Sequence, residues 1–166
     1  MPDALPVLGL VTLQRLAELW WSARNEQRLR AQGAYEVGAE HYPFMVALHA
    51  LWLAGLWFWA WPQAANWWLV GLYAALQLAR LWVIASLGAR WTTRIIVLPG
   101  APLVRTGPYR FLNHPNYLVV AIEIALLPLA FGLYLYAAIF SLANAVVLGF
   151  RIRAEDRALA NAERPV

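Results

Sequence analysis

The feature that most constrains this chain is a run without any formally charged side chain, residues 43–79. As one continuous helix the run would be about 55 Å long, whereas the hydrocarbon core of a bilayer is about 30 Å thick. The run must therefore fold back on itself, and the segment from Pro62 to Asn66 favours a turn. The sequence predicts two membrane spans here, over residues 44–61 and 67–87.

A second apolar run, residues 115–150, carries a single charge, Glu123. Pro128 and Gly132 lie near its middle and favour a bend there. We therefore expect a tight hairpin of two further spans, over residues 115–129 and 133–150. A first span is expected over residues 5–21, although Arg15 and Glu18 interrupt it.

The overall composition indicates that lipid is the main solvent of this protein. Of the 166 residues, 62% are hydrophobic and 13% are charged, whereas a soluble domain has about 45–50% and about 25%. No composition shift, linker or internal repeat divides the chain. The sequence predicts an all-α integral membrane protein, with five transmembrane helices in a single domain over residues 1–166.

The arginines indicate how the spans are oriented. All 13 basic residues are arginine, and eleven of them lie in residues 22–42, 88–114 and 151–166. The loops over residues 62–66 and 129–133 carry no charge. By the positive-inside rule the three basic segments are cytoplasmic, with the N-terminus outside and the C-terminus inside. Because these arginines flank apolar runs, they indicate membrane topology and no nucleic-acid partner.

Several kinds of site are excluded or disfavoured by residue type. The chain has no cysteine, so it has no disulfide, thiolate metal site or cysteine nucleophile. His41, His49 and His114 lie far apart in the sequence and form no metal-ligand spacing. We expect no metal.

The long segment from Gly88 to His114 is the first candidate for chemistry, because connections of this length are usually functional or disordered. Residues 95–98, a turn at Pro99-Gly100, and residues 102–104 predict a short hairpin at the membrane surface. An ordinary interfacial loop held by Trp91 and Ile95 is an equally good interpretation.

The next segment, Gly107 to Leu118, leads directly into the predicted fourth span. Local structure explains part of it, because Asn113 or His114 can cap a helix and Pro115 suits the first turn. Capping does not require that four polar and aromatic side chains gather together at a helix N-terminus, where an anion such as a carboxylate is favoured. Aromatic faces can also hold a sulfonium cation. These side chains are Tyr109, Arg110, His114 and Tyr117.

The C-terminal segment continues the fifth span beyond the membrane. Arg151 and Glu155 are four residues apart, and Arg153 and Asp156 are three apart, so each pair can share a helix face. The simplest interpretation is a salt-bridged helix anchored near anionic headgroups.

Taken together, the two segments resemble a known pattern. G-P-Y-R-x3-H-P-x-Y at residues 107–117 leads into a membrane helix, and R-x-R-x-E-[ED]-x2-L follows at residues 151–159. This pairing resembles the isoprenylcysteine carboxyl methyltransferase family, with phospholipid methyltransferases as more distant relatives. The resemblance covers about residues 80–160. Family members often have arginine before the His-Pro pair, where this chain has Asn113, and the second acidic position is Asp156 rather than glutamate.

The resemblance implies a helical membrane bundle without a Rossmann domain, and S-adenosylmethionine as the methyl donor. The cosubstrate would lie on the cytoplasmic side, between the loop before the fourth helix and the C-terminal helix. The residues implied to bind it are Val97, Leu98, Gly107, Tyr109, Arg110, His114, Asn116, Tyr117, Leu118, Glu155 and Asp156. The residues implied to lie nearest methyl transfer are Arg151, Arg153 and Glu155, and Glu155 either orients an arginine or binds the amino end of the cosubstrate.

Three further residues are candidates for contacts with the methyl acceptor: Arg80, Glu123 and His41. Charges within spans usually face a cavity or a partner. Glu123 is too deep to reach the interface, so it either pairs with Arg80 or Arg15 or lines the acceptor cavity. Arg80 either snorkels to the interface or contributes to that cavity. An interfacial cap explains His41 equally well.

The first hypothesis for function is therefore methyl transfer to an oxygen of a lipophilic acceptor, such as a carboxylate, phenol or enol. The lysine-free, arginine-rich composition is typical of a high-GC bacterial source, where prenylated protein substrates are not expected. This favours a lipophilic small molecule or a membrane lipid as acceptor, and the inner membrane as location. Short members of the family resemble bacterial enzymes that O-methylate long-chain phenols and pyrones. The alternatives are an N-methyltransferase of phospholipid amines and a non-enzymatic membrane binding or assembly protein.

Overall fold

The computed structural model describes residues 3–162. Within that range the chain forms five α-helices, α1 Ala4–Ala31, α2 Tyr42–Trp59, α3 Trp67–Leu87, α4 Pro115–Ala130 and α5 Tyr134–Ala162. The remaining elements are the short 3-10 helices η1 Ala39–His41, η2 Gly88–Arg90 and η3 Gly107–Arg110, and the strands β1 Tyr35–Val37 and β2 Ile95–Val97. Arg164, one of the eleven arginines that indicate topology, lies outside the described residues.

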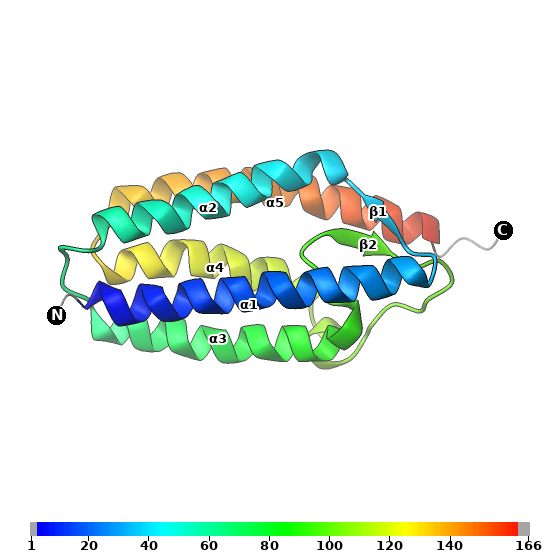
Figure 1. Ribbon diagram of the computed structural model, residues 1–166, viewed down its shortest axis with the longest axis horizontal. Coiled ribbons are helices and arrows are strands. Elements are labelled where there is room, and N and C mark those ends of the chain that lie inside the picture. The colour runs from blue at the N-terminus through cyan, green and yellow to red at the C-terminus, as the bar shows by residue number, and fades with distance from the viewer. Residues whose placement is uncertain (1–2, 163–166) are drawn as a thin grey trace.

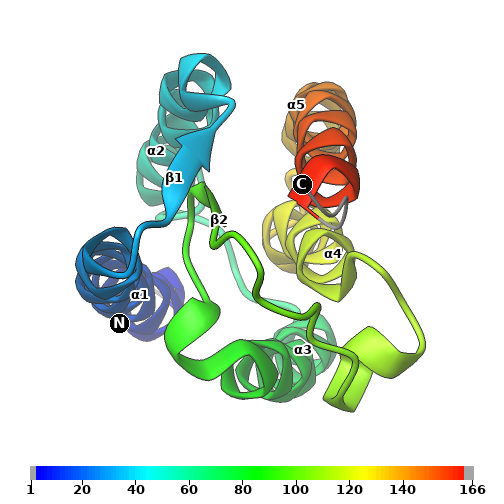
Figure 2. The ribbon, with the colours of Figure 1, turned by 90° about the vertical axis from the view of Figure 1, so that its right-hand side faces the viewer.

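The helices run along the long axis of the molecule as an elongated bundle (Figure 1). Viewed from the end that carries the strands, they follow one another around a ring in the order α1, α2, α5, α4, α3 (Figure 2). The first residue of every predicted span lies within two residues of the first residue of an observed helix. Two helices extend beyond their predicted spans, because α1 continues to Ala31 and α5 to Ala162.

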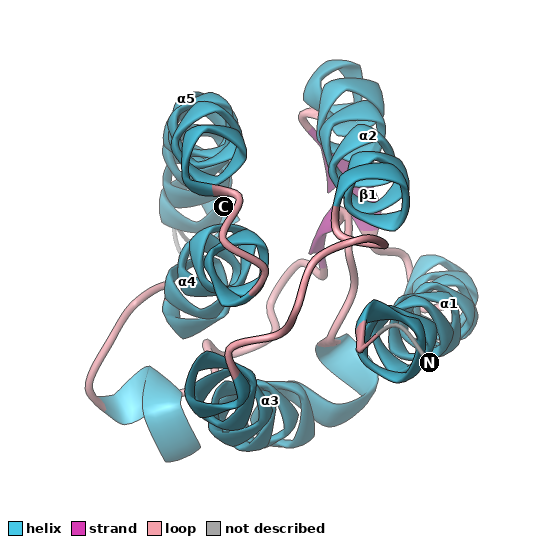
Figure 3. Cartoon of the chain, turned by 90° about the vertical axis from the view of Figure 1, so that its left-hand side faces the viewer, coloured by secondary structure: helices cyan, strands magenta, loops and turns pink. Residues whose placement is uncertain are grey.

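The two ends of the bundle differ in the length and charge of their connections. At one end, short uncharged loops join α2 to α3 and α4 to α5 (Figure 3). There the side chain of Asn66 caps α3 by accepting hydrogen bonds from the N–H groups of Trp68 and Leu69. The three basic segments meet at the other end (Figure 1), so the predicted partition of charge between the two ends is confirmed.

Among residues 3–162, three helices are long and apolar enough to cross a membrane, namely α2, α3 and α5. Helix α4 is apolar but has 16 residues, and α1 is interrupted by the charges of Arg15 and Glu18. The spans expected at α1 and α4 therefore stay predictions. Large apolar side chains cover the outside of the bundle, as contact with lipid requires, and examples are Leu10, Phe58, Trp68 and Leu142.

The interior near the uncharged end is a conventional apolar core. Leu8 of α1, Leu56 of α2 and Leu127 of α4 are fully buried there. Trp52 is also buried, and its indole N–H donates to the carbonyl of Ile124 at 3.1 Å. This part of the interior therefore contains no unpaired charge among the described residues.

Nearer the charged end, the interior contains a cluster of charged side chains from three helices, which we call the buried charge cluster. It consists of Arg15 and Glu18 of α1, Arg80 of α3 and Glu123 of α4. The Glu123 carboxylate accepts hydrogen bonds from Arg15 at 2.8 Å and from Arg80 at 2.9 Å, and Arg80 also binds Glu18 at 2.6 Å. Two positive and two negative side chains face one another, so the cluster is neutral, as burial of charge demands.

The cluster decides between the two alternatives for Glu123, because this carboxylate pairs with both arginines. The snorkelling alternative for Arg80 is wrong, since its side chain is 5% exposed and binds inward to Glu18 and Glu123. A short side chain such as Glu123 has no route to the interface, so the longer arginines bend to reach it.

The predicted hairpin over residues 95–104 is also wrong, and the fold is not purely α-helical. Strand β2 pairs antiparallel with β1, with Tyr35 opposite Val97 and Val37 opposite Ile95. Residues 102–104 form no strand, and Pro102 has no N–H group to donate to a ladder. The partner strand comes instead from the segment that follows α1.

We predict that Glu123→Gln strongly destabilises the bundle. The substitution leaves Arg15 and Arg80 with one carboxylate between them, and breaking a buried ion pair on one side costs about 3–5 kcal/mol. Unfolding with a denaturing detergent, followed by circular dichroism, measures the change. The matched control is Glu40→Gln, because the Glu40 side chain is 72% exposed and such a pair contributes at most about 1 kcal/mol. Equal stability of the two variants would contradict a structural role for the cluster.

A second prediction concerns the contact between α2 and α5. Gly55 of α2 lies against Tyr136 of α5, whose hydroxyl donates to the carbonyl of Trp52 at 2.8 Å. A methyl group at residue 55 would collide with that hydroxyl, so Gly55→Ala should cost about 1–3 kcal/mol of stability. Gly71→Ala adds the same methyl group where no atom lies within 4 Å. That control should be neutral or stabilising by up to about 1 kcal/mol in the same unfolding assay.

Candidate functional site

A pocket of about 680 Å³ opens at the charged end of the bundle. Most of its wall comes from two regions that are distant in sequence, residues 87–117 and residues 151–160, and Leu29 of α1 adds to it. Figure 2 shows the connection after α3 crossing the middle of this end of the ring. The pocket therefore exists only when the helices are assembled.

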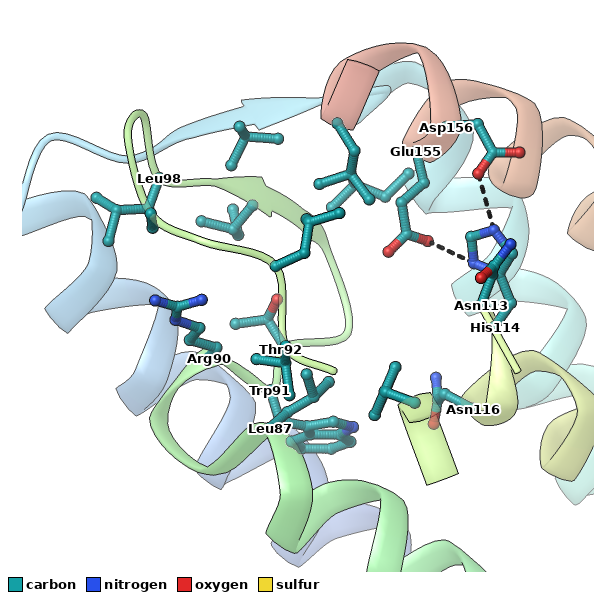
Figure 4. Close-up of a pocket in the computed structure, with 18 of the residues that line it drawn as sticks. Leu87, Arg90, Trp91, Thr92, Leu98, Asn113, His114, Asn116, Glu155 and Asp156 are labelled. Atoms are coloured by element: carbon teal, nitrogen blue, oxygen red, sulfur yellow. Dashed lines mark hydrogen bonds and ion pairs between the residues drawn. The ribbon is translucent and has the colours of Figure 1, made fainter. Parts of the chain in front are cut away.

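Short polar contacts in the pocket join the start of α4 to α5. The hydroxyl of Tyr117 donates to the Glu155 carboxylate at 2.6 Å, and a ring nitrogen of His114 lies 2.9 Å from Asp156. The second nitrogen of His114 lies 3.7 Å from Glu155, and the rings of His114 and Tyr117 stack with centroids 5.5 Å apart. Figure 4 shows His114 between the two carboxylates. The two sequence motifs thus form one side of a single site.

These contacts replace the salt bridges expected along α5. Glu155 and Asp156 turn toward α4 rather than toward Arg151 and Arg153, so the interpretation as a solvated, salt-bridged helix is wrong for this face of α5. Arg151 is 4% exposed, and it donates to the carbonyl of Thr93 at 2.9 Å. Its guanidinium carbon also lies 5.8 Å from the centre of the Tyr117 ring.

The loop that forms the inner wall of the pocket is fastened to α1 by two buried polar side chains. Asn25 donates to the carbonyl of Trp91 at 2.8 Å, and Ser22 accepts from the N–H of Thr93 at 2.8 Å. Asn25 and Ser22 are 1% and 2% exposed. Because Arg151 holds the same loop from the other side, residues 91–93 bridge α1 and α5.

A second set of contacts fastens the segment that follows this loop. Arg94 binds Glu36 of β1 at 2.6 Å, and its guanidinium lies 3.9 Å from the centre of the Tyr42 ring. Glu36 also accepts from Arg30 of α1 at 2.6 Å. Strand β2 begins directly after Arg94 and pairs with β1. Its Val97 lines the pocket.

The electrostatic character of the pocket changes from one end to the other. Figure 4 shows Glu155 and Asp156 in the upper part of the pocket and Trp91 with Asn116 below them. Burial raises the pKa of the Tyr109 hydroxyl, and the negative charge of Glu155 raises it further. Tyr109 is therefore a neutral hydrogen-bonding group throughout the physiological pH range.

Most of the cosubstrate residues implied by the family resemblance line this pocket. They are Val97, Leu98, Tyr109, Arg110, His114, Asn116, Tyr117, Glu155 and Asp156, together with Arg151 from the catalytic set. Gly107, Leu118 and Arg153 do not line it. Gly107 has a backbone reason for its identity, because its φ is +57° and a Cβ there would collide with the side chain of Ser86.

The three residues expected to contact the methyl acceptor lie elsewhere. Arg80 and Glu123 belong to the buried charge cluster and do not line the pocket. His41 stacks on Phe150 of α5, with ring centroids 5.9 Å apart. For Glu123 the sequence left two alternatives open, and the structure selects pairing with Arg15 and Arg80 over a place in the acceptor cavity.

Several pocket residues were not expected from the sequence. Trp91 was interpreted only as an interfacial anchor, whereas it is 2% exposed and lines the pocket with Leu87 and Thr92. No sequence signal identified Ser22 or Asn25 as supports of this loop. They lie about two helical turns beyond Arg15 and Glu18 on α1, and only the position of the loop gives them a role.

Comparison with known proteins agrees with this geometry. The chain is 42% identical over 158 residues to the uncharacterized protein YpbQ of Bacillus subtilis (strain 168), covering 92% of this chain and 94% of that protein. No solved structure matches significantly. The sequence model of the isoprenylcysteine carboxyl methyltransferase family matches residues 69–161, which include most of α3, the pocket loop, α4 and the pocket side of α5. This chain therefore belongs to the isoprenylcysteine carboxyl methyltransferase (ICMT) family.

Proposed function

We propose that this protein is a membrane-embedded methyltransferase that uses S-adenosylmethionine and methylates an oxygen of a lipophilic acceptor. The observation that carries the proposal is the contact of His114 and Tyr117 with Glu155 and Asp156 across one pocket. The family supplies the reaction class, and the pocket is the place where the two motifs of the chain meet.

The residues present fit this cosubstrate in size and in chemistry. A volume of about 680 Å³ lies within the range of about 300–1,000 Å³ that is usual for small-molecule and cofactor sites. Glu155 and Asp156 match the ammonium group of the amino acid part, and Tyr109 and Tyr117 offer aromatic faces near a sulfonium. When bound, S-adenosylmethionine supplies an electrophilic methyl group on positively charged sulfur.

The protein's own residues would mainly orient the reactants and exclude water. Tyr117 and His114 fix the Glu155 carboxylate, and Arg151 is fixed by Thr93, so the charged groups of the pocket are held in place before any ligand binds. Preorganised charges of this kind are the main source of electrostatic stabilisation in enzymes. Methyl transfer is an in-line displacement, which depends strongly on alignment.

The location in the membrane is part of the same proposal. We infer that all five helices cross the bilayer, with the pocket end on the cytoplasmic side where the cosubstrate is made. The arginines at this end support the orientation. Pairing within the buried charge cluster supports spans at α1 and α4, because it neutralises the charges that these two helices carry.

The first test is binding of S-adenosylhomocysteine to the purified protein in detergent, measured by isothermal titration calorimetry. We predict saturable binding by the wild-type protein and a loss of affinity of about tenfold to a hundredfold in Glu155→Gln, because a charge-assisted contact is removed. Glu40→Gln, whose carboxylate is exposed and outside the pocket, should bind like the wild-type protein. Absence of binding by a folded wild-type protein would favour the non-enzymatic alternative.

The second test is transfer of a labelled methyl group from S-adenosylmethionine to a total bacterial lipid extract. We predict products that gain one methyl group on an oxygen, identified by mass spectrometry, and no such products from Glu155→Gln at equal protein concentration. Label on the amine of a phospholipid headgroup would replace the proposal with the N-methyltransferase alternative. A protein that binds S-adenosylhomocysteine but labels no extract would contradict methyl transfer.

A further inference from the structure

Two hydrogen-bond donors at the inner end of the pocket have no partner among the described residues. They are the indole nitrogen of Trp91 and the Nε of Arg151, and both atoms are buried. Their side chains are 2% and 4% exposed, and both line the pocket. Buried donors are paired in most proteins, so two such donors at one pocket indicate an oxygen-bearing ligand.

The position of these donors separates them from the carboxylates. Arg151 precedes Glu155 by one turn of α5, about 6 Å along the helix toward the lipid-facing part of the chain. Figure 4 shows Trp91 and Asn116 in the lower part of the pocket, below Glu155 and Asp156, with the nitrogen edge of the indole turned toward the side where Asn116 lies. Leu87, the last residue of α3, lines this same end.

We propose that the indole N–H of Trp91 and the Nε of Arg151 together bind the ionised oxygen of the methyl acceptor. This inference rests on the proposed function and assigns it a specificity-determining residue, Trp91. The two ligands would share the pocket, with the amino end of the cosubstrate at Glu155 and Asp156 and the acceptor at the inner end. Leu87, the last residue of α3, offers an apolar contact to a lipophilic acceptor at this end.

The chemistry of the donors favours an acidic oxygen over an amine. A guanidinium and an indole N–H stabilise an oxygen anion and lower the pKa of a bound phenol, enol or carboxylic acid. The acceptor would first lose its proton to water. The oxygen then forms a bond to the methyl carbon as the sulfur–methyl bond breaks, and the bonding pair remains on sulfur, which becomes neutral. The Trp91 and Arg151 donors cannot accept an N–H group of an amine nucleophile, and the acceptor beside them that lacks a partner among the described residues is the Oδ1 of Asn116.

The supports of the loop explain why these donors stay in place. Asn25 holds the carbonyl of Trp91, and Thr93 holds Arg151 through its own carbonyl. The Nη2 atom of Arg151 is used in that bond, which leaves Nε free to bind a ligand. The side chain of Arg151 is thus anchored at one nitrogen and available at another.

The test uses 2-dodecyl-4-nitrophenol, whose phenolate absorbs near 400 nm, and its methyl ether, which cannot ionise. With the purified full-length protein in detergent, we expect saturable binding, a pKa of the bound phenol about one unit below its value in empty micelles, and at least about tenfold weaker binding of the methyl ether. This readout requires neither methyl transfer nor knowledge of the natural acceptor, and it needs no variant.

The variant Trp91→Phe removes the indole N–H and keeps an aromatic ring. We expect it to bind the phenolate about tenfold to a hundredfold more weakly while its affinity for S-adenosylhomocysteine stays within about twofold of the wild-type value. The matched control is Trp68→Phe, the same change at a residue that is 75% exposed at the far end of α3. That control should retain both affinities.

Three results would overturn the proposal. The first is a Trp91→Phe protein that binds S-adenosylhomocysteine and the phenolate as the wild-type protein does. The second is a loss of S-adenosylhomocysteine affinity in that variant, which would place Trp91 at the cosubstrate. The third is a wild-type protein that binds phenol and methyl ether equally, and this result applies even if Trp91→Phe does not fold. Binding of S-adenosylhomocysteine in the third case would leave the proposed methyltransferase function standing.

Discussion

Burial of charge is the constraint on which the rest of this structure depends. Glu123 lies inside the bundle at 1% exposure, and an unpaired carboxylate there would cost several kcal/mol. Its pairing with Arg15 and Arg80 ties α1, α3 and α4 together at one level of the bundle. Helix α1 makes few backbone contacts with α3, so these long side chains set the spacing between the two helices.

The site depends on that spacing. On α1, Ser22 and Asn25 lie about 10 Å beyond Arg15 and Glu18, at the level where the loop after α3 crosses the bundle. Placing α1 correctly therefore places the hydrogen-bond partners of residues 91–93. Because Arg151 holds the same loop from α5, the inner wall of the pocket is fixed at both sides. In our proposal this preorganisation lets Trp91 and Arg151 act on the acceptor oxygen.

The sequence predicted much of the fold, and part of the candidate site. The helix limits follow from charge-free runs broken at Pro62 and Gly132, because lipid excludes charge over a fixed length. His114, Tyr117, Glu155 and Asp156 were identified through two motifs, and the structure brings them into contact. Trp91 was overlooked, because tryptophan near a membrane helix end usually serves as an interfacial anchor. The strand partner of residues 95–97 was also wrong, since pairing between distant segments leaves no local pattern.

The sequence by itself determined that the chain consists mainly of apolar helices, that its basic segments meet at one end, and that it carries both motifs of the ICMT family. These properties follow from hydrophobicity and local residue patterns, which are written into consecutive residues. Only the tertiary structure decided that Arg80 and Glu123 pair with each other instead of lining the pocket, and that Glu155 turns toward Tyr117 instead of Arg151. The physical reason is that a charged side chain binds whichever partner the assembled helices bring within reach, and that choice depends on residues far away in the chain.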